Sequence, residues 1–148
     1  MSAIAFYLSG HGFGHAKRMM VLASALAEQL ADLQVSIIST VPEWLLRLNL
    51  ATPFHLRERA LDVGVVQLDS IRLDPAATLS AYARLLEGLP AIVRDEAEIL
   101  RRERVGLVVA DIPPAAFLVA QRAGLPGIGI SNFSWDWIYA DYVRAMPE

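Results

Sequence analysis

Residues 4–18 read IAFYLSGHGFGHAKR, an apolar run that ends in a glycine cluster carrying two histidines. The apolar run at residues 4–9 is typical of a strand that is buried on both faces of a parallel sheet. From Ala16 to Leu30 apolar residues recur at helical spacing, and a second β-branched run follows at residues 35–39. Strand, glycine loop, helix and strand within about 40 residues predict a βαβ unit.

The same alternation continues to the end of the chain. We expect strands at 54–57, 107–110 and 127–130, and a loop over one sheet edge at 61–73. Helices are expected at 42–48, at 115–123 with Gly124 as cap, and at 135–142. A longer helical region at 75–104 should be broken or kinked at Gly88 and Pro90. This order predicts an α/β, Rossmann-like domain with a mainly parallel sheet and helices on both faces.

Composition narrows the class of protein. The 148 residues are the usual size of one domain, and a hydrophobic fraction of 55% favours a sheet buried on both faces or a surface for a missing partner. Without an apolar run of about 18 residues or a basic start, we expect no membrane span, no signal peptide and a cytoplasmic location. A net charge of -3 gives no drive towards nucleic acid, and the absence of cysteine excludes disulfides.

The last segment ends without a closing element, which indicates a single domain, 1–148, truncated before a second, C-terminal domain. The chain acting alone would then lack part of its site.

The glycine loop is the first candidate site. In open α/β sheets, ligands bind beyond the carboxyl ends of the strands, where this loop lies. Gly10, Gly12 and Gly14 would let the backbone approach a ligand, and the free N–H groups at the helix start favour an anion or polar oxygen. The spacing differs from the dinucleotide fingerprint.

Two histidines in this loop are candidate catalytic residues. We place His15 at or next to the helix N-cap, where the helix dipole disfavours imidazolium, so a neutral ring could take a proton from a hydroxyl. Lys17 and Arg18 in the first turn oppose the dipole, which a ligand anion would offset. The alternative is that the glycines form a tight turn and that His11 and His15 cap backbone groups. A metal site lacks a clear third ligand, and we expect no cofactor.

Asp111 follows a buried strand and precedes Pro113 and Pro114. A carboxylate at this strand end faces the same crevice, where it would orient a histidine or hold a substrate hydroxyl. Equally, it would serve as a helix N-cap or a turn residue.

The third candidate segment, residues 131–139, reads SNFSWDWIY. Asn132, Trp135 and Asp136 are the candidates for substrate contacts, because tryptophan stacks on sugar faces and amide or carboxylate groups bind hydroxyls. Most of the aromatic residues here are better interpreted as core, or as buried against a missing half. Gln67 and Asp69 in the 61–73 loop are weaker candidates.

Residues 9–18 and 131–139 together closely resemble the N-terminal region of plant L-arabinokinases and related bacterial glycosyltransferase-like proteins. Residues 64–69 and 111–114 also lie where that family has similar loops, so the resemblance covers almost the whole chain. It implies the N-terminal half of a GT-B glycosyltransferase fold. No kinase signature is present. Lys17 departs from the pattern, because plant relatives tend to have a small hydroxyl residue there.

The resemblance implies the acceptor-binding half of a glycosyltransferase in carbohydrate metabolism, using a nucleotide-sugar, such as a UDP-sugar, and a hydroxyl acceptor. His15 or His11 matches the family's catalytic position. The fragment alone would be inactive. One alternative is a non-catalytic sugar or nucleotide-sugar binding module that regulates a fused sugar kinase. A dinucleotide-binding oxidoreductase is a weaker alternative, because Ser39 and Thr40 stand where such domains have an acidic residue at the end of the second strand.

Overall fold

The computed structural model describes residues 2–146 and contains a five-stranded sheet in the order β3-β2-β1-β4-β5. The strands are β1 (Ala3–Leu8), β2 (Gln34–Ile38), β3 (Phe54–Arg57), β4 (Leu107–Asp111) and β5 (Gly127–Gly129). All four neighbouring pairs are parallel. The predicted α/β, Rossmann-like class is therefore confirmed.

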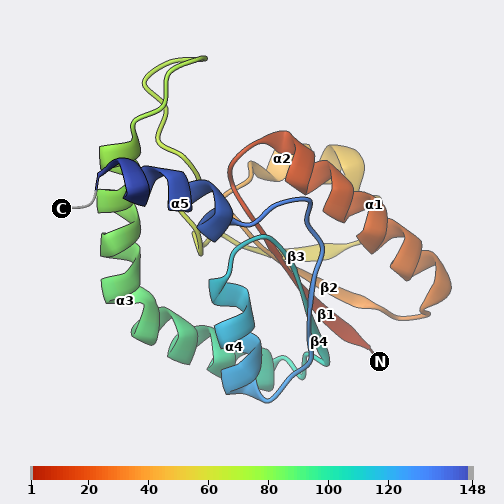
Figure 1. Cartoon of the computed structure of the whole chain (residues 1–148). Helices are drawn as coiled ribbons and strands as arrows, with labels where there is room; N and C mark the ends of the chain where they lie inside the picture. Colours follow the sequence, from red (N-terminus) through yellow and green to blue (C-terminus); the bar gives the residue numbers. More distant parts are fainter. Residues whose placement is uncertain (1, 147–148) are drawn as a thin grey trace.

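Helices cover both faces of this sheet (Figure 1). The helices are α1 (Phe13–Gln29), α2 (Glu43–Asn49), α3 (Pro75–Arg102), α4 (Ala115–Ala123) and α5 (Trp135–Ala145). One apolar cluster joins the sheet to α1 and α2, and another joins it to α3 and α4. A third, smaller cluster is built around α5.

The central strand β1 explains why the apolar run at the start of the sequence does not alternate with polar residues. Phe6 and Leu8 belong to the cluster under α1 and α2, whereas Ala5 and Tyr7 face α3 and α4. Because successive side chains of a strand point to opposite faces, a strand covered on both sides must be apolar throughout.

One helix boundary differs from the prediction. Helix α1 begins at Phe13 with Gly12 as N-cap (φ 81°), three residues before Ala16. The periodic stripe starts only at Ala16 because that residue is the first of α1 to be buried. His15 consequently lies inside the first turn and not at the N-cap.

Helix α3 is continuous through Gly88 and Pro90 and bends in its middle (Figure 1). Of the two predicted alternatives, a break or a kink, the structure therefore shows the kink.

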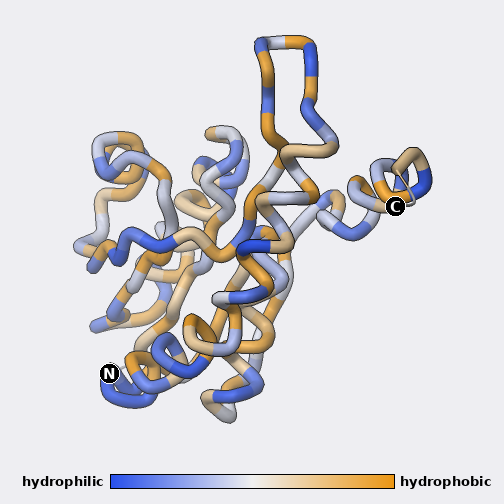
Figure 2. Tube along the Cα trace, turned by 90° about the vertical axis from the view of Figure 1, so that its left-hand side faces the viewer, coloured by the Kyte–Doolittle hydropathy of each residue, from blue (hydrophilic) through white to orange (hydrophobic). Residues whose placement is uncertain are grey.

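The segment between β3 and α3 does more than cross a sheet edge. Leu61 and Asp62 are buried, whereas residues 67–73 are exposed. An antiparallel bridge between Gln67 and Leu73 closes this tip, which projects from the body of the domain (Figure 2). Asp69 accepts backbone hydrogen bonds from Ile71 and Arg72, which lower the pKa of its carboxyl together with the Arg72 side chain.

A buried ionic network fixes α3 to the sheet. The Glu96 carboxylate is 1% exposed and accepts hydrogen bonds from the Tyr7 hydroxyl and from Arg57 Nη2, each at 2.8 Å. Burial and the adjacent Glu96 raise the pKa of Tyr7, so its hydroxyl keeps the proton that it donates. Burial alone would lower the pKa of Arg57, but hydrogen bonding and charge interaction with Glu96 outweigh it and raise the pKa.

Replacing Glu96 tests this network. Glu96→Ala leaves Arg57 buried without its main counter-charge, so we expect a loss of about 3–5 kcal/mol in the free energy of unfolding. Glu43→Ala is the control, because Glu43 pairs with Arg47 on the exposed surface of α2 and should cost less than about 1 kcal/mol. Urea denaturation measures both; equal losses would contradict the role given to Glu96.

Candidate functional site

The pairing of β1 with β4 places the glycine loop against Asp111. Leu8 and Asp111 are register partners at the carboxyl ends of these strands, and the Ser9 amide donates to the Asp111 carbonyl at 2.8 Å. The first turn of α1 therefore lies over the end of β4. His15 and Arg18 are three residues apart in α1 and share one face of the helix.

His15 and Asp111 form a hydrogen-bonded pair. His15 Nδ1 lies 2.8 Å from Asp111 Oδ1. The Asp111 side chain is fully buried, whereas 12% of the His15 side chain is exposed. An ionised carboxylate can only accept, so Nδ1 carries the hydrogen when His15 is neutral. Within residues 2–146, Nε2 of His15 has no hydrogen-bond partner, which makes it the ring nitrogen open to a ligand.

Arg18 holds the same carboxylate from the other side. Its Nε lies 2.8 Å from Asp111 Oδ2, and its Nη2 lies 2.9 Å from Oδ1 and 2.7 Å from Oδ2. This arrangement resembles the fork by which arginine binds carboxylates. Asp111 thus makes side-chain contacts with α1 and does not cap α4, whose N-cap is Pro114.

A surface hollow of about 320 Å³ opens beside this pair. Its walls come from the glycine loop, from α1 and from the segment before α5, and they comprise His11, Gly12, Gly14, His15, Arg18, Asn132 and Phe133. The Phe133 ring packs edge-on against the His15 ring at 5.6 Å. The structure therefore brings the glycine loop, the start of α1 and residues 132 and 133 together around one hollow, while the Asp111 carboxylate lies buried behind His15 and Arg18 and does not line it.

His11 is held by residues that the sequence did not single out for this purpose. Its ring lies against buried Gly64, where an added Cβ would come within 2.0 Å of His11 Cγ, and it packs edge-on against Trp135 at 6.1 Å. The Tyr139 hydroxyl donates to the Gly64 carbonyl at 2.6 Å. Burial and the charge of Asp62 raise the pKa of Tyr139, so this donor stays protonated.

Trp135, a predicted substrate contact, does not line the hollow beside His15 and presents little free surface. It is 5% exposed, its Nε1 donates to Asp62 Oδ2 at 2.9 Å, and its ring stacks on Tyr139. Asp136 is exposed at the start of α5 and lines a second cavity of about 330 Å³. Phe133 lines both this cavity and the hollow beside His15.

The remaining predicted residues lie in several places. Gly10 packs so closely on Thr40 that a Cβ there would lie 2.0 Å from the threonine hydroxyl oxygen. Lys17 is exposed and does not line the hollow, and because α1 begins at Phe13, Lys17 and Arg18 lie beyond the first turn in which they were predicted. Gln67 and Asp69 lie in the projecting tip, and neither lines the hollow.

Phe133, Asp62 and Gly64 are the site residues that sequence reasoning missed in these roles. Phe133 is one of the aromatic residues of the 131–139 segment, most of which the sequence indicated as core or as buried against a missing half. Gly64 carried a signal too, since a glycine between apolar residues often marks a positive φ or a close approach, and here φ is 64° with His11 packed against it.

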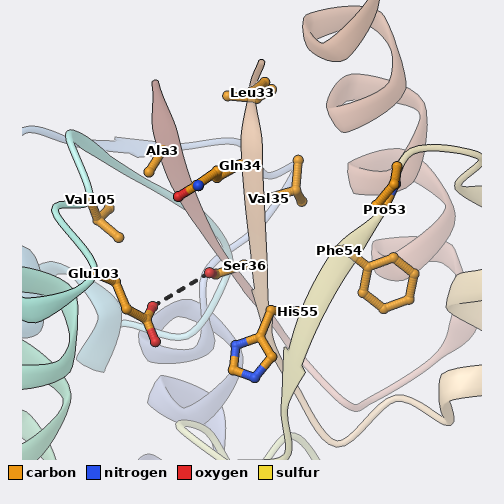
Figure 3. A pocket seen from close by; sticks show the side chains of 10 residues that line it. All are labelled: Ala3, Leu33, Gln34, Val35, Ser36, Pro53, Phe54, His55, Glu103 and Val105. Carbon is orange, nitrogen blue, oxygen red and sulfur yellow. Dashed lines mark hydrogen bonds between the residues drawn. The ribbon is translucent and has the colours of Figure 1, made fainter. Parts of the chain in front are cut away.

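Another hollow, of about 440 Å³, lies at the amino ends of the strands (Figure 3). It contains His55, Ser36 and Glu103, and Glu103 also pairs with Arg57. Ligands of open α/β sheets bind at the opposite, carboxyl ends. The hollow beside His15 is therefore the better candidate, although it is the smaller of the two.

The pair can carry out acid–base chemistry. A neutral imidazole whose Nδ1–H is held by a buried carboxylate presents Nε2 as a proton acceptor. No group of three or more histidine, aspartate or glutamate side chains in the described part of the chain could hold a metal ion.

Comparison with solved structures defines the class of fold. The chain superposes on a UGT transferase from Siraitia grosvenorii in complex with UDP (TM-score 0.59, 14% identity) and on a UGT from Phytolacca americana complexed with UDP-2-fluoro-glucose and pterostilbene (0.60, 16%). It also superposes on a UDP-glucose:anthocyanidin 3-O-glucosyltransferase in complex with UDP (0.59, 17%). Each match covers 88% of this chain and 28–30% of the other. The chain thus has the Rossmann-like fold of a GT-B glycosyltransferase domain.

Sequence comparison identifies a more specific relative. The chain is 35% identical over 143 residues to L-arabinokinase of Arabidopsis thaliana, across 95% of its own length. It spans 14% of the length of that relative. No protein-family model matches the chain. Its fold is therefore that of a GT-B glycosyltransferase domain, and its sequence is similar to a part of L-arabinokinase, as the sequence motifs predicted. No described helix has the length and apolarity needed to cross a membrane.

The close packing of His11 on Gly64 gives a test of the site's architecture. Gly64→Ala adds a Cβ where φ is 64° and where the His11 ring already lies, so it must move His11 as well as strain the backbone. Gly124→Ala is the matched control, because φ is 75° and nothing lies within 4 Å of the added Cβ.

We expect Gly124→Ala to lower the free energy of unfolding by roughly 1–2 kcal/mol and Gly64→Ala to lower it by more. NMR of the histidine rings should show a displaced His11 in Gly64→Ala alone. An unchanged His11 signal would contradict the packing described here.

Proposed function

We propose that the chain is the acceptor-binding half of a glycosyltransferase that moves a sugar from a nucleotide-sugar, such as a UDP-sugar, to a hydroxyl group. The 2.8 Å contact between His15 Nδ1 and the buried Asp111 carboxylate carries this proposal. The fold shared with UDP-bound transferases supports the same chemistry. The sugar donor would be held mainly by a second, C-terminal domain.

In this proposal His15 is the general base. Its Nε2 takes the proton of the acceptor hydroxyl as the hydroxyl oxygen forms a bond to the anomeric carbon, and the nucleoside diphosphate leaves with the electrons of the bond that breaks. Asp111 fixes the ring orientation and stabilises the imidazolium that forms. Base catalysis of this kind contributes about 10²–10⁴-fold to a rate.

The surroundings of His15 suit an acceptor that is bound from the domain surface. Asn132 and His11 supply polar groups on the wall of the hollow, while Phe133 supplies an apolar face. Beyond Phe133, the second cavity is lined by aromatic residues such as Tyr82 and Phe117, with Asp136 at its edge. An acceptor that places a hydroxyl at His15 would rest its remaining surface on these groups.

A second function deserves a test, because the sequence relative is a kinase and this chain spans only a small part of it. The domain would then bind a sugar or nucleotide-sugar without catalysis and regulate a fused sugar kinase. His15 and Asp111 would in that case act as hydrogen-bonding groups for a ligand hydroxyl.

Substituting the proposed base tests the transferase. In the full-length protein supplied with a panel of UDP-sugars and hydroxyl acceptors, His15→Ala should lower the rate of UDP release by about 10²–10⁴-fold. Asp111→Asn should cause a smaller loss. His55→Ala, in the hollow at the amino ends of the strands, is the control and should keep full activity. Full activity in His15→Ala would refute the catalytic assignment.

Calorimetry separates the two functions. A transferase half whose donor site lies in a second domain should show weak or no binding of UDP-sugars to the 148-residue chain, with binding restored in the full-length protein. A regulatory module should bind the nucleotide-sugar within this chain and lose that binding in Asn132→Ala. Tight binding to the isolated chain with no UDP release by the full-length protein would favour the module.

A further inference from the structure

We infer that Arg18 is a positioning residue that keeps His15 neutral, because it supplies the permanent counter-charge to the Asp111 carboxylate. The inference rests on the proposed role of His15 as a base, since only a neutral ring can accept a proton. It also changes the interpretation of Arg18, whose charge the sequence assigned to ligand binding.

The contacts show that Arg18 and His15 share one carboxylate. Arg18 reaches both oxygens of Asp111 at 2.7–2.9 Å, and His15 reaches Oδ1 at 2.8 Å. Arg18 Nη2 also lies 3.4 Å from His15 Nδ1. Because the guanidinium cannot lose its proton under ordinary conditions, this positive charge is present at every relevant pH.

The charges around Asp111 explain how Arg18 would keep His15 neutral. With Arg18 in place, one cation and one carboxylate balance while His15 is neutral. Protonating His15 would put a second cation beside the guanidinium around a single buried anion. Without Arg18, Asp111 would be a fully buried carboxylate whose nearest ionisable neighbour is the imidazole. A buried carboxylate favours a cation beside it, so the loss of Arg18 would favour the imidazolium form of His15 over the neutral form.

The other groups around His15 do not replace this cation. The glycine loop contributes His11, which lines the same hollow and packs on Gly64 and Trp135. The segment before α5 contributes Asn132 and Phe133, neither of which is charged. Within residues 2–146, Arg18 and His15 are the cationic or potentially cationic side chains that contact Asp111.

The two-point contact of Arg18 also fixes the orientation of the Asp111 carboxylate. Two parallel contacts hold the plane of the Asp111 carboxylate, so Oδ1 stays directed at His15 Nδ1. That contact selects the tautomer with hydrogen on Nδ1 and leaves the Nε2 lone pair open to the hollow. Because α1 begins at Phe13, Arg18 lies beyond its first turn, and the Asp111 carboxylate is its main charged neighbour.

The test reads the protonation of His15 directly. We would record ¹⁵N NMR signals of the histidine rings at about pH 7 in the 148-residue chain and assign His15 with His15→Gln. The wild type should show hydrogen on Nδ1 alone. Arg18→Gln should show hydrogen on both ring nitrogens, the imidazolium pattern. Arg18→Lys keeps the charge and should stay neutral at His15.

Two controls complete the comparison. Arg47→Gln removes an arginine that pairs with Glu43 on the exposed surface of α2, and it should leave the His15 signals unchanged. In Arg18→Gln combined with Asp111→Asn, both charges are gone, and His15 should again be neutral. A neutral, Nδ1-protonated His15 in Arg18→Gln would overturn the inference.

If Arg18→Gln is unfolded at pH 7, the pH dependence of its folding provides the test. Protonated His15 can replace the lost cation, so lowering the pH to about 6 should restore the fold. A variant that is unfolded at both pH values would also overturn the inference. These measurements need no substrate, so a failure of the transferase proposal would appear separately, as absent UDP release with the expected NMR result.

Discussion

The arrangement of the site depends on one buried carboxylate. Asp111 is the last residue of β4 at the carboxyl end of the sheet, and its two oxygens bind side chains from the first two turns of α1. The backbone of the same residue accepts from Ser9, directly before the glycine loop. A charge at zero exposure is tolerated only where it is paired. The pairing therefore fixes where α1 begins relative to β4, and with it the wall of the hollow.

A second set of contacts holds His11, which lines the hollow. The segment at residues 61–66 passes over the glycine loop, with Gly64 against His11, while Asp62 and the Gly64 carbonyl accept from Trp135 and Tyr139. Each hydrogen bond joins parts of the chain more than seventy residues apart. The hollow is thus formed by tertiary packing of three segments and is not a property of the glycine loop alone.

Much of the fold could be predicted from the sequence, because buried parallel strands and amphipathic helices have distinct apolar patterns. Every expected strand is present, and Gly124 caps α4 in the left-handed conformation. The error occurred where the pattern is weak, because the first turn of α1 has no buried residue before Ala16. At Pro90 the sequence left a break and a kink open, since proline removes one backbone donor, and α3 is bent but continuous.

The site was less predictable than the fold. Strand order could be used to place His15 near Asp111, since both follow strands that end at the same sheet edge. The sequence could not show which anion pairs with Arg18, because the choice between a ligand anion and a protein carboxylate depends on side-chain geometry. The sequence could not show that Trp135 is buried either, since an aromatic residue at the start of a helix is compatible with both core and surface.

Lys17 gives this domain an unusual chemical handle. It is the single lysine of the chain, and it is exposed on the same turn of α1 that carries His15 and Arg18. Reagents selective for ε-amines would therefore modify one side chain, next to the proposed site. A fluorophore attached there would report on changes near His15 and Arg18, such as ligand binding, without any engineered cysteine.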